Sequence, residues 1–199
     1  GSWLLSYNIN THEAKNWGVP LIGNWLPCFN VDTVRGKLVG TGTNKTLLSW
    51  DTIEKKVTFT GYPPNGWVWW ERAMLLDPAT GKFWTTDFSD GKHRFMSFDP
   101  ALNRFSRYEV TPPPSPFTGN VNCLRGYTDR PAADGWFYCC SKSESGPRGL
   151  ALFRFHPEGK NGPEVEPLGV TWDDGRDTLQ MVLSPKGRYV YYWPQGSGD

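Results

Sequence analysis

The chain has 199 residues, of which 38% are hydrophobic and 21% are charged, a balance typical of a globular domain that can bury one sizeable core. Its 21 basic and 20 acidic residues give a net charge of +1, so no strong field would attract a nucleic acid or a membrane surface. No apolar run approaches the roughly 20 residues of a membrane helix. No signal peptide is expected at Gly1-Ser2, a pair typical of an expression remnant.

The composition predicts an all-β fold. The sequence holds 22 Gly, 17 Pro and 11 Trp, a combination of turn formers and strand-favouring aromatics. No stretch keeps the i, i+3, i+4, i+7 apolar spacing of a helix over 11 residues or more. We therefore expect many short strands joined by tight turns.

Two strand units repeat along the chain. The first begins as Leu4-Leu5-Ser6-Tyr7-Asn8, an apolar strand that ends in a polar turn, and it returns at 47–51, 95–99 and 152–156. The second is a Gly followed by an aromatic strand, at Gly36, Gly81, Gly135 and Gly187, spaced by 45, 54 and 52 residues. Further strands are expected after the first unit, at 56–59 and 104–108, and before the second, at 72–77 and 179–184.

Four strands in each period of 45 to 55 residues indicate the blades of a β-propeller. Naming the strands a to d outward from the axis, the a-to-b turns lie at Asp77 to Gly81 and Ser184 to Gly187, and the c-to-d turns at Asp99-Pro100 and His156-Pro157. The predicted single domain has blade 1 at 21–62, blade 2 at 63–112 and blade 3 at 117–170. A shared fourth blade takes 171–199 plus 1–20.

The shared blade follows from the order of strands at the two ends. The chain begins with strands c and d and finishes with strands a and b. Pairing of these two half blades would close a ring of four blades and leave no edge strand open. The alternatives are a piece of a larger ring, or half of a ring made by two chains.

Residues 77–110, DPATGKFWTTDFSDGKHRFMSFDPALNRFSRYEV, resemble the blade repeat of streptogramin lyase-like and gluconolactonase-like propellers. The stretch from Met181 to Tyr191 is similar to the Ser-Pro-x-Gly-x-x-x-Tyr blade of many bacterial propellers. The resemblance implies a propeller scaffold, with an axial divalent metal in gluconolactonase-like members and a His and Glu pair with magnesium in lyase-like members. Those families have six or seven blades, so no catalytic residue is carried over to this chain.

Histidine and cysteine spacing predicts no metal site. His12 and His156 fall near c-to-d turns, whereas His93 falls in a b-to-c loop at the opposite face. Four cysteines show no ligand spacing, and we expect them to be free and buried, with one disulfide as the alternative in a secreted protein; they are Cys28, Cys123, Cys139 and Cys140. No catalytic residue, metal ligand or cofactor is predicted.

Polar residues recur where each a strand begins, at one mouth of the expected channel. Arginine offers paired donors to a carboxylate or phosphate, and indole rings suit sugars and cations. The alternative is an internal network of ion pairs that plugs the axis. The candidate ligand-binding residues are Trp67, Trp69, Glu71, Arg72, Asn122, Arg125, Arg176 and Asp177.

Two functions follow from this rim. The favoured one is a module that binds a small anionic or carbohydrate ligand, or a protein, aided by the loops at 111–117 and 141–149. The alternative is a metal-dependent lactonase or lyase, with a cation held by Glu71, Asn122 and Asp177. We expect a secreted or periplasmic protein without nucleic-acid or membrane partners, either a monomer or a dimer if a second chain completes the ring.

Overall fold

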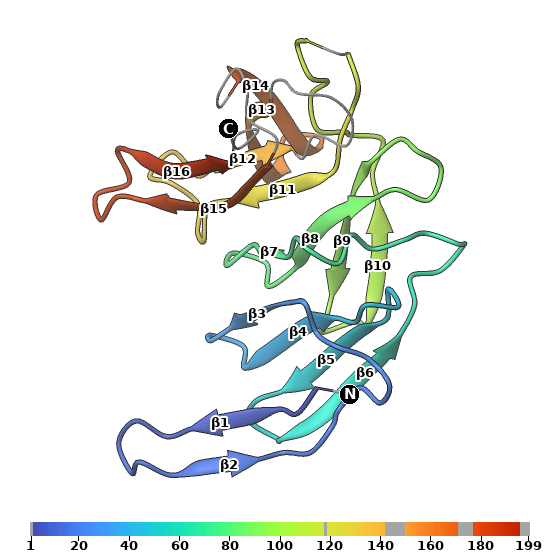
Figure 1. Cartoon of the computed structure of the whole chain (residues 1–199), viewed down its shortest axis with the longest axis vertical. Helices are drawn as coiled ribbons and strands as arrows, with labels where there is room; N and C mark the ends of the chain where they lie inside the picture. Colours follow the sequence, from blue (N-terminus) through green and yellow to red (C-terminus); the bar gives the residue numbers. More distant parts are fainter. Residues whose placement is uncertain (1, 118, 142–149, 171–176, 196–199) are drawn as a thin grey trace.

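A computed structural model describes residues 2–117, 119–141, 150–170 and 177–195. This part of the chain contains sixteen strands and no helix, and therefore no helix capable of crossing a membrane. Figure 1 shows the sheets following one another along an open arc, from the N-terminal hairpin to the C-terminal hairpin. The all-β propeller architecture with blades of four antiparallel strands is confirmed, and sixteen strands are the number that four blades require.

Three sheets are complete blades, and in each the strands lie in chain order. Every pair within them is antiparallel, as short turns between successive strands require. Blade 1 is β3 (Cys28–Asp32), β4 (Lys37–Thr41), β5 (Leu47–Asp51) and β6 (Lys56–Gly61); blade 2 is β7 (Leu75–Leu76), β8 (Phe83–Asp87), β9 (Arg94–Asp99) and β10 (Arg104–Arg107); blade 3 is β11 (Leu124–Tyr127), β12 (Phe137–Ser141), β13 (Ala151–Gly159) and β14 (Gly162–Val170).

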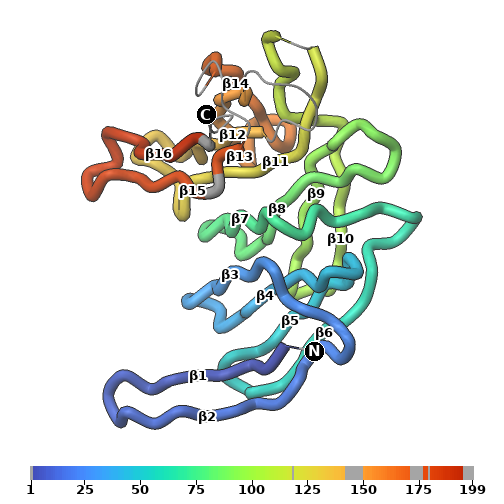
Figure 2. Tube along the Cα trace, in the orientation of Figure 1, coloured from blue at the N-terminus to red at the C-terminus, as the bar shows by residue number. Residues whose placement is uncertain are grey.

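The remaining four strands form two separate hairpins. β1 (Leu5–Tyr7) pairs with β2 (Ala14–Asn16), and β15 (Asp177–Leu183) pairs with β16 (Val190–Gln195). The predicted joining of these half blades into one shared blade is corrected here, because the described residues contain no pairing between them. The trace in Figure 2 places the hairpins at opposite ends of the arc, since three blades in succession do not curve enough to bring them together.

The same hydrogen-bonded turn recurs between the third and fourth strands. The Oδ1 atoms of Asn8, Asp51 and Asp99 each accept hydrogen bonds from the amides two and three residues further on. The fourth turn differs from the prediction, because His156 and Pro157 lie inside β13, which continues to Gly159 after an irregularity in its pairing with β14.

Apolar side chains fill the two junctions between complete blades. Val39 and Leu47 of blade 1 are buried with Phe83 and Phe98 of blade 2. The opposite face of blade 2 packs on blade 3 through a second set of buried side chains, among them Trp84, Phe95, Phe137, Phe153 and Phe155. The rings of Phe95 and Phe155 stack with centroids 4.2 Å apart. Each complete blade therefore buries apolar side chains against its neighbour.

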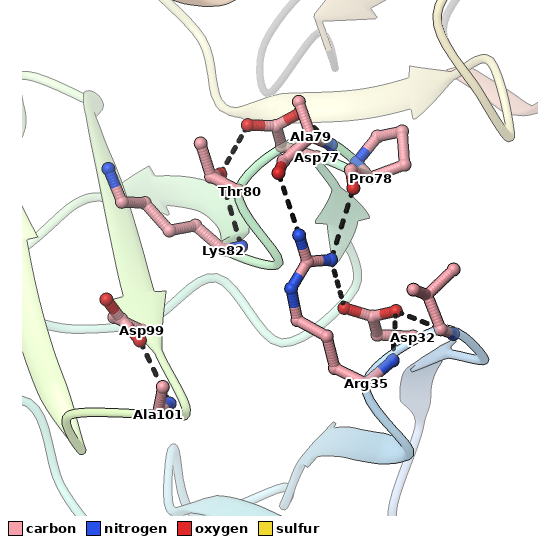
Figure 3. Close-up of polar contacts among 10 residues, drawn as sticks. Asp32, Arg35, Asp77, Pro78, Ala79, Thr80, Lys82, Asp99 and Ala101 are labelled. Carbon is pink, nitrogen blue, oxygen red and sulfur yellow. Dashed lines mark hydrogen bonds and ion pairs between the residues drawn. The ribbon is translucent and has the colours of Figure 1, made fainter.

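An arginine joins the a-to-b turns of blades 1 and 2. The Arg35 guanidinium donates to Asp32 at 2.9 Å in its own turn, and to the carbonyl oxygens of Pro78 and Ala79 at 3.1 and 2.7 Å in the next (Figure 3). Gly81 adopts a φ of +76°, and a Cβ built there would lie 2.7 Å from Arg35 Cδ. The turn thus requires glycine for its conformation and for the space that Arg35 occupies.

Two matched substitutions separate these requirements. Gly91 has the same φ of +76° as Gly81, but a Cβ there would meet nothing within 4 Å. We expect Gly91→Ala to lower the free energy of unfolding by about 1 kcal/mol through backbone strain, and Gly81→Ala to lower it by about 1–3 kcal/mol more through overpacking. Urea denaturation measures both. Equal losses would show that the contact with Arg35 does not restrict the turn.

Candidate functional site

A cavity of about 590 Å³ opens between the β8–β9 loop of blade 2 and the connection from β10 to β11. It is lined by Gly91, Lys92, His93, Thr111, Gly119, Asn120, Val121 and Asn122. These residues provide one cation, an imidazole, a hydroxyl and two amides, and none of them carries a carboxylate. The volume lies in the range of small-molecule sites.

The β8–β9 loop, which forms one wall of the cavity, is stabilised by hydrogen bonds outside the cavity. Gly91 and His93 have φ values of +76° and +49°, which turn the chain sharply between β8 and β9. The Arg94 guanidinium hydrogen bonds to Asp90 and donates to Glu109 at 2.8 Å. The hydrogen bond from Arg94 lowers the pKa of the Asp90 carboxyl. Asp90 and Glu109 thus share one arginine, and neither carboxylate is among the residues that line the cavity.

A chain of ring and cation contacts leads from the cavity wall to a predicted site residue. The buried His93 ring stacks on Phe88, with centroids 6.2 Å apart. The Nζ atom of Lys45 lies 5.3 Å from the Phe88 ring and forms an ion pair with Glu71. Glu71 therefore lies at the same end of the blades as His93, paired with a cation from the β4–β5 loop.

The two predicted tryptophans lie in the contact between blades 1 and 2. Trp69 is fully buried, and the Arg107 guanidinium lies 4.8 Å from the Trp67 ring. Asp87 holds both tryptophans in place. It accepts a hydrogen bond at 2.8 Å from the amide of Val68, which lies between them in the chain, and another at 2.9 Å from Arg107. Burial alone would raise the pKa of Asp87, but these hydrogen bonds outweigh it and lower the pKa.

A third group of predicted residues lies at the inner strands. Arg125 of β11 donates through Nε to both carboxylate oxygens of Asp177 of β15, at 2.8 and 3.1 Å. Arg125 is only 8% exposed, so this ion pair belongs to the interior. Arg72 is exposed, and Arg176 lies outside the described residues, as do 142–149 of the predicted binding loop. The structure thus places the predicted residues apart from one another, with Glu71 beside Lys45, the two tryptophans between blades 1 and 2, and Arg125 with Asp177 at the inner strands. Of the predicted site residues that are described, Asn122 alone lines the cavity.

No disulfide joins the four cysteines, all of which lie in the described residues; three are buried and Cys28 is half-buried. Cys139 and Cys140 face opposite sides of β12, since Cys139 packs in the junction with blade 2 and Cys140 Sγ lies 3.8 Å from the Thr178 carbonyl oxygen of β15. Burial raises the pKa of Cys140 to about 12 and raises that of Cys139 as well. Both thiols therefore stay protonated at neutral pH.

Sequence reasoning missed Lys92 and His93 as cavity residues, whereas Thr111 belongs to the predicted binding loop at 111–117. A signal for them was present, because b-to-c loops and d-to-a connections end at the same face of a blade. His93 was interpreted as one loop histidine among three, although it lies opposite the polar stretch that ends in Asn122. Among the described residues no three His, Cys, Asp or Glu side chains come together as metal ligands would.

No family model and no curated protein matches this sequence. Several solved structures are similar to this chain and align with 96–99% of its length. TolB from Acinetobacter baumannii matches with a TM-score of 0.52 at 15% identity, covering 99% of this chain and 44% of that one. Kuenenia stuttgartiensis hydrazine synthase gives 0.60 at 15%, covering 96% and 55%, and a putative 6-phosphogluconolactonase from Bacteroides fragilis gives 0.55 at 10%, covering 96% and 56%.

These similarities define the class of protein as a β-propeller, the scaffold that the sequence resemblance implied. At 10–15% identity they show the fold and carry no activity to this chain. The chain spans about half the length of the solved chains that it matches.

The ion pair at the inner strands provides a stability prediction. Arg125→Ala removes the partner of Asp177, whose side chain is 15% exposed, and we expect it to lower the free energy of unfolding by about 3–5 kcal/mol. Arg72→Ala, at an exposed position, should change it by less than about 0.5 kcal/mol. Chemical denaturation of both variants decides the matter. A nearly unchanged Arg125→Ala variant would place this arginine in a ligand site instead.

Proposed function

We propose that this propeller module binds a small polar ligand, anionic or a carbohydrate, in the cavity between the β8–β9 loop and the β10–β11 connection. The observation that carries the proposal is the lining, which offers hydrogen-bond donors and acceptors, a lysine and no carboxylate. Such a lining favours an anionic or polyhydroxy ligand over a cation, because an unpaired anion gains from Lys92 and is not repelled by the wall.

Glycine positions support the proposal. Gly91 and Gly119 both line the cavity with φ near +70° to +76°, and a Cβ at either would meet nothing within 4 Å. The two glycines therefore leave room for a ligand beside the main chain, while their amides donate within their own turns, Gly91 to the Phe88 carbonyl oxygen at 3.3 Å and Gly119 to that of Ser115 at 2.8 Å. Asn122, only 7% exposed, adds a buried amide to the lining.

The metal-dependent alternative lacks a comparable observation. Glu71 is paired with Lys45, and Asp177 with Arg125, so both proposed carboxylate ligands already face cations. A putative lactonase is among the similar structures, but at 10% identity. We retain binding as the proposed function, and a secreted or periplasmic location stays a prediction.

Calorimetric titration with inorganic phosphate, gluconate and glucose tests the proposal. We expect at least one probe to bind, and Asn122→Ala to abolish that binding because it removes the buried amide of the wall. For a charged probe, Lys92→Ala should weaken binding about tenfold through the loss of one exposed ion contact. If glucose alone binds, a carbohydrate site is indicated and Lys92→Ala should have little effect.

The matched control is Lys186→Ala in the exposed β15–β16 turn, which also removes one positive charge but lies outside the cavity. It should leave the affinity of every probe unchanged. Circular dichroism melting confirms that each variant is folded. Absence of binding by all three probes, or equal losses in Lys92→Ala and Lys186→Ala, would contradict the proposed site.

A further inference from the structure

A groove of about 670 Å³ follows β14, the outermost strand of blade 3, because five consecutive residues of that strand, 163–167, line it. Its other side is formed mainly by the start of the β10–β11 connection. Six of the ten lining residues are apolar: Val110, Pro113, Trp136, Pro163, Val165 and Pro167. The others are Thr111 and the carboxylates Glu109, Glu164 and Glu166, and the lining holds no lysine or arginine. We call this feature the acidic groove.

Each arginine beside the acidic groove is shared between two carboxylates, one that lines the groove and one outside it. These contacts join Arg94 to Glu109 and Asp90, and Arg154 to Glu166 and Asp134. Two guanidinium groups therefore face four carboxylates, and the groove keeps an excess of negative charge.

Glu164 adds a further negative charge. It is exposed and forms no ion pair with any residue of the described chain. Its Oε1 atom accepts a hydrogen bond from the Lys160 amide at 2.9 Å, which holds the carboxylate in place. A carboxylate with two oxygens has acceptor capacity left for a cation from outside.

We propose that the acidic groove binds a basic peptide segment of a partner protein in an extended conformation. Glu164 and Glu166 lie two residues apart, so their side chains share one face of β14 at a spacing of about 6.6 Å. Residues i and i+2 of an extended peptide have the same spacing. Lysine or arginine at those two positions can therefore meet both carboxylates at once.

The residue between the two cations meets an apolar surface. Val165 points to the face of β14 opposite Glu164 and Glu166, and it packs with Val110 beside the core that joins blades 2 and 3. An extended peptide turns its intervening side chain towards this face. The groove thus favours the order cation, apolar residue, cation.

Trp136 gives the groove a rigid aromatic wall. The Arg154 guanidinium lies 4.5 Å from the Trp136 ring, and the His156 ring contacts it edge to face with centroids 5.4 Å apart. A ring held by two neighbours loses little conformational entropy when a ligand packs on it.

Prolines in β14 explain why charge rather than strand addition should select the peptide. Within the described chain β14 pairs with β13 alone, so its other edge is open. Pro163 and Pro167 have no amide hydrogen, and an edge-strand proline directs its nitrogen away from the neighbouring strand. The open edge therefore lacks donors at two positions and cannot form a complete ladder with a peptide. Recognition must depend on the side chains of the groove.

The acidic groove is distinct from the ligand cavity proposed above. Thr111 lines both, but the cavity has a lysine and no carboxylate, whereas the groove has three carboxylates and no cation. The two sites therefore favour ligands of opposite charge.

Fluorescence anisotropy with two labelled peptides tests the proposal. The probes are Val-Lys-Val-Lys-Val-Gly, with lysines two residues apart, and its isomer Val-Val-Lys-Lys-Val-Gly, with adjacent lysines that point to opposite faces of an extended chain. Both carry the same charge and composition. We expect the first peptide to bind about fivefold more tightly, because only it reaches both glutamates with one face.

Glu164→Gln removes one of the two charges but keeps an oxygen that can accept from the Lys160 amide. We expect it to weaken binding of the first peptide about fivefold and to abolish the preference for that peptide over its isomer. The matched control is Glu54→Gln, which removes the same charge at an exposed position of the β5–β6 turn outside the groove. It should leave both affinities and the preference unchanged. Circular dichroism melting shows whether each variant is folded.

Each result decides the proposal. A preference that disappears in Glu164→Gln and persists in Glu54→Gln supports it. Equal affinities of the two peptides would indicate general charge attraction, and a preference that survives Glu164→Gln would place the peptide elsewhere. Displacement of the labelled peptide by spermidine as effectively as by the unlabelled peptide would assign the groove to a free polyamine. Each of these three outcomes, or no binding, overturns the proposal.

Lys92→Ala separates this proposal from the ligand cavity. It alters the cavity and not the acidic groove, so it should leave the affinity for the first peptide unchanged. A loss in Lys92→Ala as large as in Glu164→Gln would show that the peptide does not recognise the groove itself, and would also overturn the proposal.

Discussion

The structure depends on burial of apolar strands against the next blade. Side chains alternate across a strand, so a blade between two neighbours needs apolar residues at successive positions. Blade 2 shows this directly, because Phe83 packs towards blade 1 while the adjacent Trp84 packs towards blade 3. Removing a buried ring of this size typically costs about 3–5 kcal/mol. The same requirement leaves the end hairpins unsatisfied, since each has an apolar face that no blade of its own chain covers.

The two ends of the blades have different tasks. At one end, carboxylates and amides stabilise turns: Asn8, Asp51 and Asp99 accept backbone hydrogen bonds, and Arg35 joins the turns of two blades. These polar groups are used within the fold. At the other end the loops are wider and leave the cavity beside His93 and Asn122.

Much of the fold was predictable because turns repeat locally. The φ values of +76° and +65° at Gly81 and Gly187 confirm the positive φ that their turns were expected to need, and Cys139 and Cys140 face opposite ways as adjacent strand residues must. The continuation of β13 past His156 was not predictable, because an irregularity in pairing depends on the partner strand. Closure of the ring was not predictable either, since it depends on curvature summed over three blades.

The candidate site was harder to predict than the fold for a related reason. Asn122 was recognised from its own segment, but Lys92 and His93 belong to a loop almost thirty residues earlier, and only the packing of blade 2 on blade 3 brings the two together. The indole rings of Trp67 and Trp69 were expected to bind a sugar or a cation. Asp87 and Arg107 instead hold them inside the contact between blades 1 and 2.

The cavity and the free strand edges involve different parts of the chain. The cavity lies wholly at the junction of blades 2 and 3, whereas the free edges belong to β1 and β16 at the ends of the arc. The ion pair of Arg125 and Asp177 lies across β11 and β15. It fixes the C-terminal hairpin against blade 3, and a hairpin held in this way keeps the β16 edge in one orientation.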